Sequence, residues 1–423
     1  MGGMIENLLS DVQIPRFIRV KQHFSSEHIA PEDIPAAVLQ ELEKPGIVET
    51  VRPGMRVCLT CGSRGIDNIV SIVRTVAQFC KDRGALPFAI PAMGSHGGAT
   101  AQGQLEVLTS FGITEDSIGC PILSSMETKQ IGFTEEGHPV FIDRNAAEAD
   151  AIIVINRIKP HTSFRGTYES GLMKMMAIGL GKQKGASVCH ADGFPRMHHM
   201  VPLFGNAILK NAPVIFGLGI LENAFDKTAI LKALTPEQIV TEEPKLLKKA
   251  FSLMPSLGFE SCDVLIVDEI GKNISGCGMD PNISGVFAVP GMTGGIQAQR
   301  RCILSLTEET HGNGYGMGAA DAVTKRLYEQ LDLSKVYPNS ITSTSLGFSK
   351  IPIIMPNDRE TVRLCIRTCN RIDKTAPRII RIKNTLALSE LEVSEAMLPE
   401  LKENMEVISE PYTWQFNEHG NLW

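Results

Sequence analysis

Residues 56–112 read RVCLTCGSRGIDNIVSIVRTVAQFCKDRGALPFAIPAMGSHGGATAQGQLEVLTSFG and contain two strand-loop-helix units in direct succession. In each unit a short apolar run, 56–60 or 87–91, precedes a glycine-rich loop and then a stretch whose apolar residues have helical spacing. Apolar runs that alternate with helical patterns indicate parallel strands joined by crossover helices. The stretch therefore predicts an α/β sheet with its functional loops at the carboxyl ends of the strands.

A third unit of the same kind begins with the apolar run Ile152–Ile155 and opens the forty-residue stretch 151–190. This stretch spaces His161, Lys174 and His190 along a polar, glycine-rich segment. Lys174 stands among leucine and methionine residues, and a lysine is rarely buried unless it is paired or chemically employed. A reactive amine is one interpretation. A lysine at the edge of an apolar helix face, with its ammonium group in water, is the other.

The chain has 423 residues, which exceeds the size at which one hydrophobic core keeps growing, so we expect two domains. A charged stretch with helical pattern at 236–258 suits a connector, and strand and helix patterns restart after it. We therefore expect an N-terminal domain at 1–257 and a C-terminal α/β domain at 258–423. The predicted fold class is α/β, with two α/β domains and an active site in the cleft between them.

The net charge of −6 offers no broad basic surface for nucleic acid or an anionic membrane, so a small molecule is the expected partner. The N-terminal residues lack the pattern of a secretory signal, and no apolar segment approaches the ~18 residues of a membrane span. We therefore expect a soluble cytoplasmic protein. Its ten cysteines are expected to be reduced core residues, and the spacing of Cys58 and Cys61 is only a weak metal or redox signal.

Two glycine-rich loops carry candidate polar groups. Gly62-Ser63-Arg64-Gly65 precedes a predicted helix, whose N-terminal N–H groups favour an anion, and Arg64 adds a bidentate donor for phosphate or carboxylate. The loop 94–98 holds His96 among four small residues, and a histidine suits proton transfer near neutral pH. The alternatives are an ordinary turn with a solvated arginine and a histidine that bonds a neighbouring loop.

Taken together, these motifs resemble the nickel-dependent lactate racemase family in order and spacing; they are Ser63-Arg64, the His96 loop, Lys159-Pro160-His161, Ser170-Gly171-Leu172-Met173-Lys174 and His190. The sixteen positions from Lys174 to His190 match most clearly. The resemblance implies that Lys174 tethers the family's cofactor, pyridinium-3-thioamide-5-thiocarboxylic acid mononucleotide. It also implies that His190 is a ligand of the nickel that this pincer cofactor binds.

The resemblance further implies that His96 and His161 are the paired acid/base groups, and that Arg64 binds an anionic group of substrate or cofactor. It assigns cofactor binding to Ser63, Arg64, Ser170, Gly171 and Lys174. The N-terminal domain would then be the cofactor-binding domain, and cofactor-maturation proteins would be partners of the chain.

The chemistry of the residues agrees with this assignment. The C–H of a 2-hydroxy acid is poorly acidic, so hydride abstraction by an electrophilic pyridinium is easier than proton abstraction, provided that a base takes the hydroxyl proton. Return of hydride to either face of the keto acid requires a base on each side, and two histidines meet that requirement. A neutral lysine amine is able to take a covalent cofactor, and imidazole suits nickel.

The chain departs from the family pattern at three places. The segment between His161 and Ser170 is about three residues longer, Leu172 replaces a glycine, and Cys61 replaces an aspartate. In the C-terminal half, Lys272-Asn273 is our candidate for the substrate-binding pair. These departures and the polarity of the loops favour another 2-hydroxy acid, an aldonate such as gluconate or a lactate-like acid, with racemisation or epimerisation at carbon 2 as the isomerase reaction.

Two other functions stay open. An NAD-type oxidoreductase on an α/β scaffold should carry a glycine fingerprint after a strand, and the glycines at 179–185 lack both that spacing and the Walker spacing. A non-enzymatic nucleotide- or carboxylate-binding protein would keep Arg64 and the glycine loops without needing Lys174 and His190 in register. The sequence also leaves open whether the chain forms a homo-oligomer.

Overall fold

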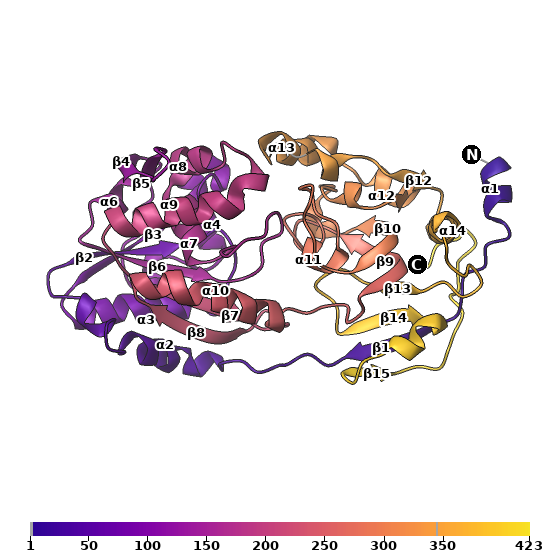
Figure 1. Ribbon diagram of the computed structural model, residues 1–423, viewed down its shortest axis with the longest axis horizontal. Coiled ribbons are helices and arrows are strands. Elements are labelled where there is room, and N and C mark those ends of the chain that lie inside the picture. Colours follow the sequence, from indigo (N-terminus) through magenta and orange to yellow (C-terminus); the bar gives the residue numbers. More distant parts are fainter. Residues whose placement is uncertain (1–2, 344–345) are drawn as a thin grey trace. The chain divides into compact units, whose positions relative to one another are not determined.

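The computed structural model describes residues 3–343 and 346–423, and the chain divides into two compact units (Figure 1). One unit is Ser25–Met254; the other joins Met1–Phe24 to Pro255–Trp423. The polypeptide therefore begins in the second unit, passes through the whole of the first and returns. The expected division at residue 257 lies close to the observed one, but the first 24 residues belong with the C-terminal part and not with the N-terminal domain.

The unit Ser25–Met254 is built on a five-stranded sheet with the order β3-β2-β6-β7-β8. Its strands are β2 (Arg56–Cys61), β3 (Leu86–Pro91), β6 (Ala151–Arg157), β7 (Val214–Glu222) and β8 (Thr228–Leu234). The first four are parallel and β8 is antiparallel to β7. The α/β sheet expected from the strand-loop-helix units is confirmed.

Both faces of this sheet are covered, because apolar residues on alternate sides of each strand enter different cores. On β6, Ile153 and Ile155 join the core with α2 (Ile34–Leu42) and α3 (Ile69–Asp82). Ile152 and Val154 of the same strand join the core with α9 (Met197–Asn211), on the other side of the sheet (Figure 1). A strand that is buried on both faces reads as a continuous apolar run, which is why Ala151–Ile155 does not alternate.

The remaining elements of this unit are short pieces and three longer helices. They are the hairpin β4 (Thr128–Phe133) and β5 (Pro139–Asp143), α4 (Ala101–Ser110), α5 (Glu115–Ile118), α6 (Arg144–Ala147), α7 (Leu172–Lys174), a π-helical turn Met175–Leu180, α8 (Lys182–Cys189) and α10 (Pro236–Leu253).

The other unit has an eight-stranded mixed sheet with the order β12-β11-β10-β9-β13-β14-β1-β15. Its strands are β1 (Phe17–Gln22), β9 (Ser261–Ile270), β10 (Gln297–Leu306), β11 (Ala322–Thr324), β12 (Ile353–Met355), β13 (Ile379–Ile382), β14 (Glu390–Ser394) and β15 (Met405–Val407). Its helices are α1 (Met4–Leu9), α11 (Pro281–Ser284), α12 (Lys325–Glu329), α13 (Leu333–Ser343) and α14 (Asp358–Thr368).

Strand β1 explains why the first residues leave the expected N-terminal domain. It pairs antiparallel with β14 on one side and with β15 on the other. Phe17 is fully buried and stacks on Trp414 with ring centroids 3.7 Å apart. Long-range strand pairing of this kind leaves no local mark in the sequence.

All ten cysteines are buried and unbridged, as expected of reduced core residues. Within 3–343 and 346–423, no helix is long and apolar enough to cross a membrane.

Candidate functional site

Three polar loops leave neighbouring strands at the same edge of the sheet in the unit Ser25–Met254. They follow β3, β2 and β6, which are adjacent and parallel, so their carboxyl ends lie side by side. The chain crosses from β2 to β3 on one side and reaches β6 on the other, so the order reverses at β2. Ligands of open α/β sheets bind at such a reversal.

Lys174 ends α7 and is followed directly by the π-helical turn Met175–Leu180. Residues on both sides of it, Met173 and Met175, are buried in the core beneath the sheet, whereas Lys174 itself is partly buried. Burial, together with the positive charges of Arg64 and Lys159, lowers the pKa of Lys174 to about 8. A π-helical turn is uncommon and is frequent at functional sites.

His190 caps the end of α8, sixteen positions after Lys174. Its Nδ1 donates to the carbonyl oxygen of Ala186 at 2.7 Å, so in the neutral ring Nε2 carries the lone pair. Burial and the charge of Lys174 lower the pKa of His190, although the bond to Ala186 opposes this. The ring is therefore neutral at pH 7 and presents one nitrogen that is able to bind a metal.

His96 has the same arrangement at the surface of the unit. Its Nδ1 donates to the carbonyl oxygen of Met93 at 2.8 Å, which leaves the lone pair on Nε2. The surrounding protein and the charge of Arg64 lower the pKa of His96, with a smaller effect from Lys174. Gly94 and Gly97 both have positive φ and make the sharp loop that holds the ring.

His161 has the opposite tautomer. Its Nδ1 accepts the backbone N–H of Ser163 at 3.0 Å, so the neutral ring carries its proton on Nε2. Burial, then the charges of Lys174, Lys159 and His190, place the pKa of His161 well below its usual value. The backbone N–H of His161 donates to Glu169 Oε2 at 2.6 Å, which fixes the start of the loop.

Arg64 lies exposed after β2, and its guanidinium donates to the carbonyl oxygen of Ser63 at 3.0 Å. Its positive charge lowers the pKa values of both His96 and Lys174. Ser170 pairs with Lys159 through two backbone hydrogen bonds, and the Gly171 carbonyl accepts from the Asn156 side chain at 2.8 Å. The cofactor residues expected from the sequence thus flank the histidines and the lysine.

The mutual effects of these charges show which predicted residues come together. The charge of Lys174 lowers the pKa values of His96, His161 and His190. The charge of Arg64 lowers the pKa values of Lys174 and His96. The structure therefore gathers five of the predicted residues at one edge of one sheet.

Lys272 and Asn273 belong to the other unit, where they follow β9. Lys272 Nζ donates to the carbonyl oxygen of Gly276 at 2.6 Å and lies 4.2 Å from the centre of the Tyr315 ring. The side-chain oxygen of Asn273 accepts from the hydroxyl of Thr307 at 2.8 Å. Both side chains thus have partners within their own unit.

Sequence reasoning missed a buried ion pair behind the site. Lys182 and Asp143 are fully buried and lie 3.1 Å apart, and Lys182 also donates to the side-chain oxygen of Gln104 at 3.0 Å. Gln104 in turn donates to the carbonyl oxygens of Gly94 and His96 at 2.9 and 3.2 Å. The network joins the helix after Lys174 to the His96 loop, and a lysine within a glycine-rich run was its only signal in the sequence.

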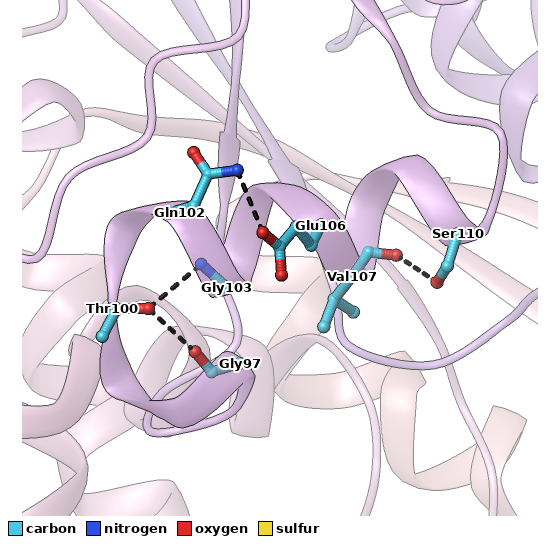
Figure 2. A pocket seen from close by; sticks show the side chains of 7 residues that line it. All are labelled: Gly97, Thr100, Gln102, Gly103, Glu106, Val107 and Ser110. Atoms are coloured by element: carbon cyan, nitrogen blue, oxygen red, sulfur yellow. Dashed lines mark hydrogen bonds between the residues drawn. The ribbon is translucent and has the colours of Figure 1, made fainter.

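A hollow of about 600 Å³ lies along α4 and is lined by Gly97, Thr100, Gln102, Gly103, Glu106, Val107 and Ser110. Figure 2 shows that its polar groups bond to one another: Thr100 Oγ1 to Gly97 and Gly103, and Gln102 to Glu106. The candidate lysine, the three candidate histidines and Arg64 do not line this hollow, so it is not the candidate site.

Two solved structures resemble the chain weakly. One is a protein from Thermotoga maritima, at 15% identity over 67% of this chain and 72% of that chain, with a TM-score of 0.46. The other is the lactate racemase apoprotein from Thermoanaerobacterium thermosaccharolyticum, at 14% identity over 80% of this chain and 98% of that chain, with a TM-score of 0.44. No curated protein matches the chain in sequence.

The family model of the lactate racemase N-terminal domain matches residues 4–198, the part that carries the three loops, Lys174 and His190. Through these residues the chain is similar to the lactate racemase N-terminal domain family.

Proposed function

We propose that the chain is an isomerase, a nickel-pincer-dependent racemase or epimerase of a 2-hydroxy acid. The observation that carries the proposal is a lysine amine with a lowered pKa beside three neutral histidines and an arginine, at the carboxyl edge of one sheet. The match to the lactate racemase N-terminal domain supports it.

The residues fit the proposed cofactor. Among the described residues, none accepts a hydrogen bond from the amine of Lys174, and its pKa of about 8 leaves a neutral fraction at pH 7 that is able to form an amide-type bond. His190 offers Nε2 as a single protein ligand. No cluster of three or more histidine, cysteine or acidic residues in the described chain could hold a metal alone, and a pincer that supplies most ligands needs none.

When bound, the cofactor would supply an electrophilic pyridinium that takes hydride from carbon 2 of the acid. The two histidines, His96 and His161, would have different roles in proton transfer. His96 presents a lone pair on Nε2 and acts as the base that takes the hydroxyl proton of one enantiomer. His161 presents N–H on Nε2, which donates a hydrogen bond to the oxygen on carbon 2, and it returns a proton to that oxygen only as the imidazolium. Inversion therefore needs one histidine neutral as the base and the other protonated as the acid, and the two exchange these states for the reverse direction.

Arg64 would hold an anionic group, either the carboxylate of the acid or the phosphate of the cofactor. Its guanidinium is a bidentate donor for such a group, and its charge lowers the pKa values of His96 and Lys174. Cofactor-maturation proteins would be the partners that load Lys174 in the cell.

The proposed substrate class is an aldonate such as gluconate, with a lactate-like acid as the alternative within the same chemistry. The test is to incubate cofactor-loaded protein, made in cells able to produce the pincer, with gluconate and with each lactate enantiomer. Formation of the carbon-2 epimer of gluconate, abolished by Lys174→Ala, supports the proposal. No inversion of either acid by nickel-loaded protein would overturn this substrate class.

A further inference from the structure

Helix α10 packs against the segment that carries the site, although its sequence suited a plain connector. Pro244 has no N–H, so the carbonyl oxygen of Val240 lacks its usual donor one helical turn later. The hydroxyl of Tyr168 donates to this oxygen at 2.7 Å. The loop between His161 and Lys174 is thereby anchored to α10 at its middle.

The neighbouring residue, Glu243, anchors the end of the same segment. It is 1% exposed, and its Oε2 accepts the backbone N–H of Met173 at 3.0 Å, with a further bond from the N–H of Leu172. Those two N–H groups open a helical run and have no partners within it. The carboxyl of Glu243 therefore caps the backbone directly before Lys174.

The fit between this carboxyl and the backbone is close. A Cβ at Gly171 would lie 2.0 Å from Glu243 Oε1, so only glycine leaves room for the cap. Oε1 has no hydrogen-bond partner among the described atoms, and burial raises the pKa of Glu243 to about 8. Burying such a group is unfavourable. An apolar side chain would fill the same space at a lower cost in free energy. A buried carboxyl at this position therefore indicates that its hydrogen bond to the Met173 backbone is needed.

We propose that Glu243 is a positioning residue, which fixes the Leu172–Met173 backbone and thereby the place of the Lys174 amine. Glu243 does not act on Lys174 by its charge, since the groups that lower the pKa of Lys174 are its burial, Arg64 and Lys159. The functional consequence rests on the proposed role of Lys174 as tether. The positioning itself concerns the bare amine.

The test is trace acetylation of the full-length, cofactor-free protein with acetic anhydride at about pH 8, read by peptide mass spectrometry. The rate at Lys174 is divided by the rate at the exposed Lys184 of the same molecule. Without the cap, the amine moves into water and its neutral fraction falls. We expect Glu243→Ala to lower the ratio by about tenfold or more, since a return of the pKa of Lys174 from about 8 toward an ordinary lysine value allows up to about a hundredfold.

Glu243→Gln keeps an acceptor oxygen for Met173 and should keep the ratio within about twofold of the original, because rescue needs the acceptor and not the charge. The matched control is Glu242→Gln on the same helix, whose carboxylate bonds Lys245 at 2.7 Å, and it should leave the ratio unchanged. If Glu243→Ala does not fold, Glu243→Asp takes its place, because the shorter side chain cannot reach Met173.

A folded Glu243→Ala or Glu243→Asp protein with an unchanged ratio overturns the inference, as does a Glu243→Gln protein that loses as much as either. The proposed function fails by a different result. A lysine that is fast to acetylate, but never carries a cofactor, would refute the racemase proposal and leave the role of Glu243 standing.

Discussion

His96 and His161 differ in which ring nitrogen carries the proton, and this difference comes from single backbone contacts. A carbonyl of Met93 fixes one ring and an N–H of Ser163 fixes the other. The sequence predicted both histidines from the loops in which they stand and from a family resemblance. It could not predict their tautomers, because each depends on the conformation of its own loop, which for His96 includes positive φ at Gly94 and Gly97.

The contact that Glu243 makes with the backbone before Lys174 could not be predicted from the sequence. It lies seventy positions after Met173, the residue whose N–H it accepts. No spacing rule connects the two, and in the sequence the glutamate is one of several charges in a stretch, 236–258, that suits a connector. Only the docking of α10 on the segment before Lys174 reveals its role.

The raised pKa of Glu243 predicts a pH-dependent stability. Because the folded pKa is about 8 and the unfolded pKa is ordinary, the folded chain holds a proton that the unfolded chain releases. The stability gained is full below about pH 4 and is lost as the pH rises through the folded pKa. Between about pH 5 and pH 8, the wild-type chain should lose stability relative to Glu243→Gln by on the order of a few kcal/mol.

Unfolding midpoints of both proteins at the two pH values check this prediction. Parallel changes in wild type and Glu243→Gln would contradict it. Glu242→Gln serves as the control, since its exposed ion pair with Lys245 should contribute little at any pH.

At the scale of elements, the strand-loop-helix units were predictable because each is encoded in one short stretch of sequence, as an apolar run, a glycine-rich loop and a helical pattern. Their docking was not. The ion pair of Lys182 and Asp143 joins α8 to the hairpin strand β5, and Gln104 extends it to α4 and the His96 loop. Contacts among elements so far apart in the chain leave no local signal.

This network predicts a specific pattern of stability. Lys182→Met leaves the carboxylate of Asp143 buried without its partner and should destabilise the protein by about 3–5 kcal/mol. Lys182→Met combined with Asp143→Asn should recover much of the loss, because the amide still caps α6 through the Asn145 N–H and no charge stays unpaired.

Urea unfolding of the single and double variants measures both values. Lys245→Met, which breaks an exposed pair, is the control and should change stability by less than about 1 kcal/mol. Equal stability of the single and double variants would show that Asp143 is not a charge that needs Lys182.

At the scale of the whole molecule, the sequence predicted two units and their α/β class but misplaced the first 24 residues. The connector pattern at 236–258 marks one boundary, and composition gives no hint of the other. Strand β1 inserts between β14 and β15, whose residues lie more than 360 positions away. Pairing over such a distance is decided by the complete fold.

A chain that begins at Ser25 should therefore lose β1 and leave β14 and β15 without their shared partner. Hydrogen exchange should accelerate in peptides covering Glu390–Ser394 and Met405–Val407, and remain unchanged in β2 and β6 of the unit Ser25–Met254. Faster exchange in β2 or β6 would contradict the division into units described above.

Whether Lys174 carries the cofactor is tested most directly by the intact mass of the protein purified from cells able to make the pincer cofactor, measured together with its nickel content. We predict a mass adduct that maps to Lys174 and about one nickel per chain, with the nickel lost in His190→Ala and both lost in Lys174→Ala. A bare Lys174 without nickel in protein from such cells would contradict the account.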